Sequence, residues 1–160
     1  MRKVIDGDVD LSFLNLTKLF DLSDVEVTKG DFFCENNCLI NLTGSPHTVN
    51  GSFWCDENNL TSLSGGPHTV KHSFYCESNN LTSLEGAPKI INEDFNCRSN
   101  KLTNIKGLPE TIGGDLVLDG YLEAEFSEEY IRSRCKIKGE IYYYDEDEDD
   151  VGDGEGWDNY

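Results

Sequence analysis

Apolar and polar positions repeat along residues 30–112 with a fixed period of 21 residues. Within each unit, an Asn lies three residues after a Cys, two apolar residues follow the Asn, and a Pro lies near the end of the unit. A fixed period in this range predicts a solenoid, in which each coil buries its apolar side against its neighbours. Two columns define the repeat, with Phe32, Phe53, Phe74 and Phe95 in the first and Cys34, Cys55, Cys76 and Cys97 in the second.

Within each coil, the Phe-x-Cys alternation predicts a short strand with both named side chains pointing inward. The conserved spacing of the Asn column predicts that each amide lies inside a bend and bonds the backbone of adjacent coils. Gly and Pro then turn the chain back. Successive coils therefore place their strands side by side in a parallel sheet.

The two ends depart from this pattern. A degenerate copy begins at Gly7 and runs 23 residues to the next, as expected for a capping repeat. A last copy begins at Gly114 and leaves the pattern at Tyr121. The pattern of Leu122–Arg134 predicts a short helix, and that of Lys136–Tyr144 predicts one or two strands. Together they are expected to cover the open edge of the sheet. We therefore divide the chain into an N-terminal capping repeat (1–29), repeats (30–121), a C-terminal cap (122–144) and an acidic tail (145–160) that is predicted to be disordered.

The formal net charge is −18, and nine of the acidic residues lie in the tail, which has no Lys or Arg. This charge argues against direct nucleic-acid binding and predicts a protein partner with a basic surface. No apolar run is long enough to span a bilayer, and the first residues turn acidic at once, unlike a signal peptide. We therefore expect a cytoplasmic protein that does not bind membranes; its oligomeric state stays open.

The repeat F-x-C-x-x-N-x-L-T-x-L-x-G-x-P resembles the leucine-rich-repeat core L-x-L-x-x-N-x-L, with Phe and Cys at the strand positions. It is similar to the short repeats of bacterial effector proteins, and closer to a repeat of bacteriophage proteins with strings such as S-L-E-G-A-P, found here at Ser83–Pro88. The resemblance covers roughly residues 7–121. It implies a leucine-rich-repeat solenoid of about five to six coils, with parallel strands on the concave face, a mostly irregular convex side and caps at both ends. No large domain follows the repeats, so the ubiquitin-ligase activity of some effectors is not implied.

If Phe and Cys point inward, the residues beside them point outward onto the concave sheet. Aromatic residues there form a stripe fenced by carboxylates, which predicts a protein-binding surface. The alternative is that the stacked aromatics only strengthen the sheet through cross-strand pairs. The predicted partner-binding residues are Phe33, Trp54, Tyr75 and Asn96 in the middle column, Asp31 and Asp94 before the Phe column, and Glu35, Asp56, Glu77 and Arg98 after the Cys column.

No nucleophile–base pair or metal cluster can be assembled, so we expect no enzyme activity, catalytic residue, cofactor or metal. The Cys column has none of the close pairing that zinc sites use, and we interpret it as buried packing thiols in a reducing compartment. Cys38 and Cys135 lie outside the column, and neither is assigned as a nucleophile. His47 and His68 recur beside Pro46 and Pro67 and are interpreted as turn residues.

The sequence thus predicts a non-enzymatic protein-binding module. The phage resemblance implies a phage-encoded protein in the host bacterial cytoplasm. There it would bind and inhibit or redirect a host defence or nucleic-acid-processing protein. The alternative is an acidic DNA mimic that blocks a DNA-binding protein, and that binding would collapse with added salt.

Overall fold

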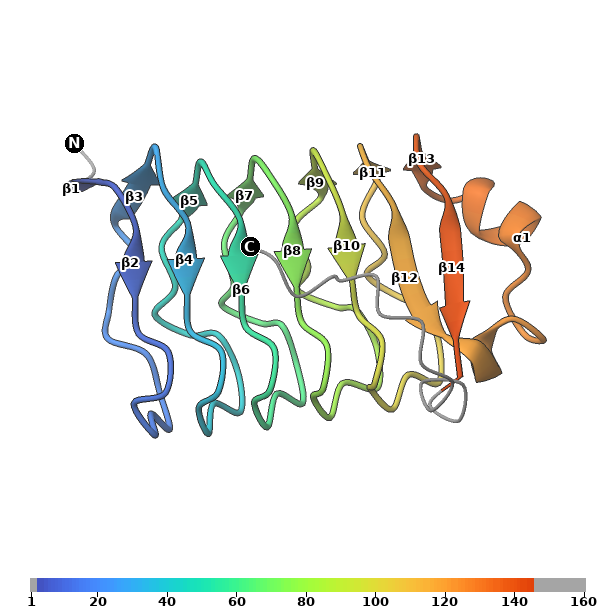
Figure 1. Ribbon diagram of the computed structural model, residues 1–160, viewed down its shortest axis with the longest axis horizontal. Coiled ribbons are helices and arrows are strands. Elements are labelled where there is room, and N and C mark those ends of the chain that lie inside the picture. Colours follow the sequence, from blue (N-terminus) through green and yellow to red (C-terminus); the bar gives the residue numbers. More distant parts are fainter. Residues whose placement is uncertain (1–2, 146–160) are drawn as a thin grey trace, which may run out of the picture.

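The computed structural model describes residues 3–145, which wind into a parallel β-solenoid of about seven turns (Figure 1). Each turn adds one strand to each of two seven-stranded parallel sheets. Sheet A contains β1 (Lys3–Asp6), β3 (Val25–Thr28), β5 (Thr48–Val49), β7 (Thr69–Val70), β9 (Ile90–Ile91), β11 (Thr111–Ile112) and β13 (Lys136–Ile137). Sheet B contains β2 (Val9–Asp10), β4 (Phe32–Phe33), β6 (Phe53–Trp54), β8 (Phe74–Tyr75), β10 (Phe95–Asn96), β12 (Leu116–Asp119) and β14 (Ile141–Tyr144). The predicted solenoid with parallel strands is confirmed.

The core is built from the columns that the repeat predicts to be inward. The four Phe and four Cys side chains of these columns are fully buried. Phe32 stacks on Phe53 with ring centroids 5.2 Å apart, and Phe53 stacks on Phe74 at 5.3 Å. The Leu columns, which include Leu39, are also buried and fill the rest of each regular coil. Every regular coil buries one member of each apolar column, and this burial is the main force that holds the coils together.

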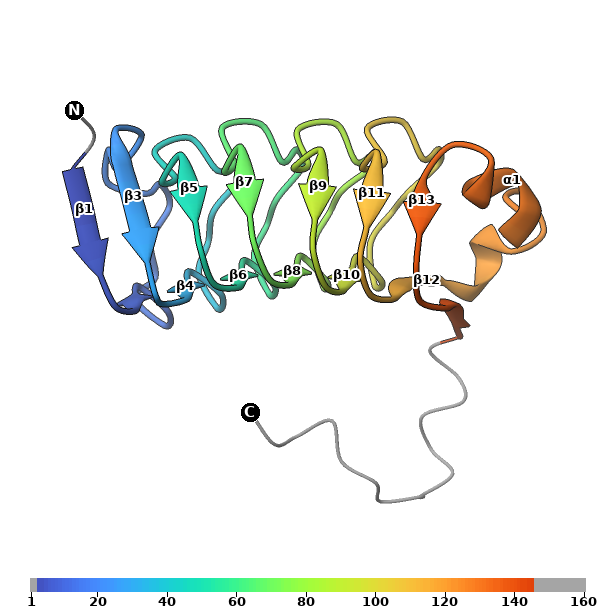
Figure 2. The ribbon, with the colours of Figure 1, turned by 90° about the horizontal axis from the view of Figure 1, so that it is seen from above.

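Sheet A corrects one expectation, because the chain outside the Phe-x-Cys strands was predicted to be mostly irregular. Figure 1 shows the strands of sheet B face on, and Figure 2 shows those of sheet A, so the two sheets form different sides of the solenoid. In sheet A, Val49 and Val70 point into the core while Thr48 and Thr69 are half-buried. A strand with only one inward residue is too short to show alternation in the sequence.

The coils follow one another along a nearly straight axis in Figures 1 and 2. The predicted distinction between a concave and a convex side therefore does not describe this molecule. The partner-binding residues predicted for a concave sheet lie on the outer face of sheet B instead.

The predicted asparagine ladder is confirmed and joins each coil to the one before it. Asn58 Oδ1 accepts a hydrogen bond from the Leu39 amide at 2.9 Å. Its Nδ2 donates to the Cys34 carbonyl at 2.9 Å and to the Cys55 carbonyl of its own coil at 3.3 Å. Asn37, Asn79 and Asn100 repeat this arrangement. Backbone groups inside the bends are thus satisfied without water.

Two turn columns adopt left-handed backbone conformations. Residues with side chains form the first of these columns, in which Glu57 has φ 48°. Glycines form the second, and Gly86 has φ +98°. A Cβ on Gly86 would lie 2.5 Å from the Leu63 carbonyl carbon of the preceding coil, so this position requires glycine.

The C-terminal segment contains the predicted short helix and strands. The 3-10 helix η1 (Gly120–Leu122) leads to helix α1 (Glu128–Arg132), which begins after Ser127 and lies at the end of the solenoid in Figure 1. Leu122 and Ile131 are fully buried in the common core. The chain then returns through β13 and β14 to extend both sheets. This return makes the solenoid longer than the five to six coils that the sequence predicts.

Of the predicted acidic tail, only Asp145 is among the described residues, and 146–160 lie outside them. Neither helix in residues 3–145 has the length and apolar character needed to cross a membrane.

Candidate protein-binding face

The outer face of sheet B carries a stripe of aromatic side chains. Phe33, Trp54 and Tyr75, here called the aromatic stripe, occupy the second position of β4, β6 and β8 and pair directly in the parallel register. The Phe33 and Trp54 rings stack with centroids 6.1 Å apart, and the Trp54 and Tyr75 rings stack at 3.9 Å. All three side chains are half-buried. Asn96 continues the same column beside Tyr75, so the structure brings the predicted middle column together.

Beside the stripe runs a second column of outward residues, two positions further along each coil. Glu35, Asp56 and Glu77 are here called the carboxylate column. The Asn36 amide donates to the Asp56 carbonyl, and the Glu57 amide donates to the Glu77 carbonyl. These backbone bonds extend the parallel pairing beyond the strands, so the three carboxylates lie one coil apart.

The carboxylate column is partly withdrawn from water and incompletely satisfied. One oxygen of each side chain is occluded and has no hydrogen-bond partner among residues 3–145, namely Glu35 Oε2, Asp56 Oδ1 and Glu77 Oε2. The indole Nε1 of Trp54 is occluded and unpartnered in the same part of the chain. An occluded polar atom without a partner costs free energy, which a binding partner with complementary groups would recover.

The same burial shifts the acidity of these groups. Burial, together with the negative charges of Glu77, Glu35 and Glu57, raises the pKa of the Asp56 carboxyl to about 7. Burial also raises the pKa of Glu35, with added repulsion from Asp10 and Glu57. The pKa of Glu77 rises for the same reason, but the neighbouring Arg98 opposes the shift. The face therefore changes charge near neutral pH.

Arg98 continues the carboxylate column by one coil and lies over an aromatic ring. Its guanidinium carbon is 5.4 Å from the centroid of the Tyr144 ring. Tyr144 and Tyr142 belong to β14 and extend the outer face of sheet B, in register with β12. The sequence analysis missed this extension, although G-E-I-Y-Y from Gly139 matches G-D-L-V-L from Gly114. The helix before Gly139 lengthens the spacing and hides the match.

Asp31 and Asp94, which were predicted to bind a partner, have one oxygen each in an internal ladder. Asp31 Oδ1 accepts from the Ser52 amide at 2.7 Å, and Asp94 Oδ1 accepts from the Asp115 amide at 2.8 Å. Each bond joins a coil to the next one at the start of a sheet B strand. These two residues therefore help to fix the coil spacing, and we leave them out of the binding face.

The column cysteines have the surroundings expected of packing residues. Cys34 and Cys55 donate their thiol hydrogens to the carbonyls of Trp54 and Tyr75 at 3.2 Å. Burial raises the pKa of the column thiols, which keeps them protonated. All six cysteines are free, and Cys38 is exposed while Cys135 is buried.

The two turn histidines also stack in register. The rings of His47 and His68 lie 5.0 Å apart. Among residues 3–145, no three His, Cys, Asp or Glu side chains are grouped so as to hold a metal ion.

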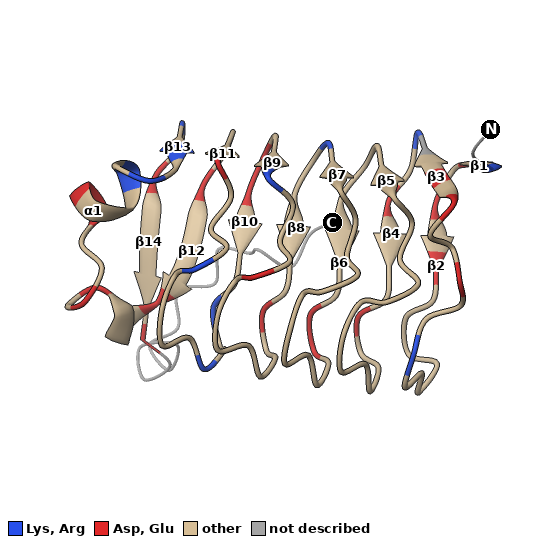
Figure 3. Cartoon of the chain, turned by 180° about the vertical axis from the view of Figure 1, so that it is seen from behind, with Lys and Arg blue, Asp and Glu red and all other residues tan. Residues whose placement is uncertain are grey.

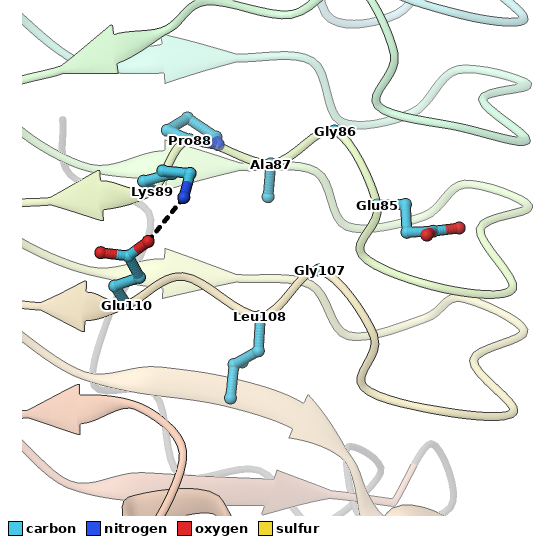
Figure 4. A pocket seen from close by; sticks show the side chains of 8 residues that line it. All are labelled: Glu85, Gly86, Ala87, Pro88, Lys89, Gly107, Leu108 and Glu110. Carbon is cyan, nitrogen blue, oxygen red and sulfur yellow. Dashed lines mark hydrogen bonds and ion pairs between the residues drawn. The ribbon is translucent and has the colours of Figure 1, made fainter.

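A cavity of about 360 Å³ opens between two neighbouring turns that precede β9 and β11 (Figure 4). The side chains of Lys89 and Glu110 meet at its rim, with Nζ 2.6 Å from Oε1. Because each of these two charges is already neutralised by the other, the cavity offers a ligand fewer unsatisfied polar groups than the outer face of sheet B does. Its lining comprises Glu85, Gly86, Ala87, Pro88, Lys89, Gly107, Leu108 and Glu110.

Acidic residues recur along successive coils, and basic residues are sparser (Figure 3).

Comparisons of the chain with family models, with curated proteins and with solved structures give no match. Function is therefore inferred from the geometry and chemistry of the face itself.

Proposed function

We propose that this chain is a non-enzymatic protein-binding module whose binding face is the outer face of sheet B. The observation that carries the proposal is the aromatic stripe beside a carboxylate column with occluded, unsatisfied oxygens. The binding face comprises Phe33, Trp54, Tyr75, Asn96, Glu35, Asp56, Glu77 and Arg98.

The aromatic stripe supplies the apolar anchors of the interface. Trp and Tyr are enriched among residues that contribute most to binding, particularly near the centre of an interface. Trp54 and Tyr75 are half-buried in the free protein, so their rings are already held in place and lose little freedom on binding. Cross-strand stacking also stabilises the sheet, but it leaves the neighbouring carboxylates and the Trp54 indole without partners.

The carboxylate column selects a partner with a basic surface. Cationic groups placed against Asp56 and Glu77 would favour the ionised carboxylates, and a rotation of each side chain would bring its occluded oxygen to the cation. The net charge of −18 would also accelerate the approach of a basic partner at low salt.

Finer parts of the proposal rest on the repeat motif. The match to the core L-x-L-x-x-N-x-L supports the leucine-rich-repeat type of solenoid, with the first coil and the segment 122–144 as its caps. The resemblance to phage repeats supports a phage-encoded protein that acts in the host bacterial cytoplasm. Its target is then a host defence or nucleic-acid-processing protein, which it inhibits or redirects.

A DNA mimic is the alternative function, and it is supported by the net charge of −18. A mimic would present a mainly anionic surface in place of phosphates. The binding face instead sets its carboxylates beside a column of aromatic rings and ends the carboxylate column with Arg98. Those features favour a protein-binding anchor over charge mimicry.

The test is a capture experiment from bacterial lysate with three immobilised proteins. These are the wild type, the double variant Trp54→Ala/Tyr75→Ala, and Ile90→Ala as a matched control on sheet A, where Ile90 is 51% exposed. We expect the wild type and the control to capture the same protein and the double variant to lose it. Equal capture by all three would place binding elsewhere and overturn the proposal, provided that circular dichroism shows the double variant to be folded.

A further inference from the structure

We propose that the binding face recognises arginine side chains of its partner, with each guanidinium lying between the aromatic stripe and the carboxylate column. This inference rests on the proposed function and names the chemistry that the face selects.

The chain itself contains a related contact, in which an arginine and an aromatic ring meet along the line of the carboxylate column. Arg98 stands in the same column as Glu35, Asp56 and Glu77, and its guanidinium lies over the Tyr144 ring. The charge of Arg98 also favours the ionised form of Glu77, one coil earlier. Sheet B thus already holds a guanidinium over an aromatic ring at one end of the column, where its charge acts on the nearest carboxylate of the column.

The preceding coils present the same kinds of surface without a cation. Trp54 and Tyr75 provide stacked ring faces, and Asp56 and Glu77 provide occluded oxygens without a partner among residues 3–145. The other charged groups that act on Asp56 are Glu35 and Glu57, and both are acidic. Because every charge that acts on Asp56 is negative, whereas Arg98 partly compensates Glu77, the coil of Asp56 fits a cationic group from outside.

Arginine fits this position better than lysine. A planar guanidinium can stack on an aromatic ring while it donates two hydrogen bonds to a carboxylate. A lysine ammonium is a more strongly hydrated point charge and gains less when it leaves water for a half-buried site. The face therefore distinguishes two side chains that carry the same charge.

The unpartnered indole of Trp54 indicates what carries the arginines. A guanidinium has only donors and cannot accept from Trp54 Nε1. A main-chain carbonyl of the same segment would provide the missing acceptor once the indole turns to expose its N–H. The occupant is therefore an arginine-bearing stretch of polypeptide rather than a free organic cation.

The experiment is a fluorescence titration of the full chain carrying Trp157→Phe, which leaves Trp54 as its only tryptophan. The probes are a short peptide with three arginines separated by serines, and the same peptide with lysines. We expect the arginine peptide to change Trp54 fluorescence and to bind about tenfold more tightly. The triple variant Glu35→Gln/Asp56→Asn/Glu77→Gln should abolish that preference. Glu123→Gln/Glu125→Gln/Glu129→Gln, which removes three negative charges outside the face, should retain it.

Equal affinity for the two peptides would overturn the arginine inference and leave the proposed function standing. A preference that survives the triple variant, or no binding of either peptide, would overturn it as well. The proposed function fails separately, if Trp54→Ala/Tyr75→Ala still captures the cellular partner.

Discussion

The indole ring of Trp54 lies 3.9 Å from the phenol ring of Tyr75, centroid to centroid, at an interplanar angle of 20°. This is the tighter of the two stacks in the aromatic stripe, since the Phe33–Trp54 pair is 6.1 Å apart. The same two coils carry Asp56 and Glu77, the two more deeply buried members of the carboxylate column. The closest ring packing and the strongest carboxylate desolvation therefore coincide at β6 and β8, which we take as the centre of the binding face.

Stability should fall as pH rises, partly because of Asp56. The folded protein keeps the Asp56 proton up to about pH 7, whereas the ordinary aspartate pKa of 3.8 applies to the unfolded chain. Between these values the folded state binds more protons, so the free energy of unfolding decreases with increasing pH. Asp56→Asn removes this contribution. We expect the variant to gain on the order of 2–4 kcal/mol relative to wild type between about pH 4 and pH 8.

Urea denaturation at the two pH values measures this difference. Glu125→Gln serves as the control, because it removes an equal charge from an exposed position outside the face. If the stability of Asp56→Asn and of wild type changes in parallel with pH, Asp56 is not the titrating group.

The asparagine ladder should be the most sensitive polar feature of the fold. Asn58→Ala leaves the Leu39 amide without its acceptor and the Cys34 carbonyl without its Asn58 donor. Because these groups are buried, we expect a loss of about 3 kcal/mol or more in the free energy of unfolding. Asn59→Ala is the matched control, since Asn59 is the next residue in the chain and its side chain is exposed. Similar losses for the two variants in urea denaturation would argue against the ladder.

The sequence predicted those features that depend on one coil and its exact repetition. A period of 21 residues is enough to place Phe53 and Cys55 inside, Trp54 outside and Asn58 in the bend. Sheet A was not predicted, because β5 turns only Val49 inward, whereas the inward pair Phe53 and Cys55 gives sheet B an alternation to recognise. The role of Asp31 depends on which amide of the next coil lies nearest, and a repeat pattern does not contain that distance.

The candidate site was likewise predicted only in its outline. Alternation brought Phe33, Trp54 and Tyr75 together beside the carboxylates, as the structure places them. The occluded oxygen of Asp56 and its raised pKa arise from packing across coils, and Tyr144 reaches the face because β14 pairs with β12 after the chain has passed through α1 and β13. Such effects depend on contacts between segments far apart in the chain.

Glu57 should be a position where a substitution stabilises the fold. Its φ of 48° is left-handed, and the preceding coil has Asn36 at the equivalent position. Asparagine tolerates this conformation better than glutamate, so Glu57→Asn should raise the free energy of unfolding by about 1 kcal/mol. Glu57→Gln separates the two effects, because it removes the charge without relieving the backbone. Equal thermal denaturation midpoints for the two variants would assign the gain to charge alone.

Thiol reactivity should distinguish the cysteines by burial. Cys38 is exposed, whereas the other five are buried. Burial also keeps the column thiols protonated, and the thiolate is the reactive form. We expect native protein to show a single rapid reaction with a disulfide reagent such as Ellman's reagent, and Cys38→Ser to remove it. Rapid reaction of a column cysteine such as Cys76 in folded protein would contradict the packing role.

The indole N–H signal of Trp54 in a nitrogen–proton correlation spectrum tests the central claim most directly. The chain has two tryptophans, so Trp157→Phe assigns the signal without ambiguity. The partner isolated by capture is added to the labelled protein in steps. If the outer face of sheet B is the binding face, the Trp54 signal moves or broadens in proportion to the bound fraction, since its unpartnered N–H gains an acceptor. A partner that binds while the Trp54 signal stays unchanged would show that the interface lies elsewhere.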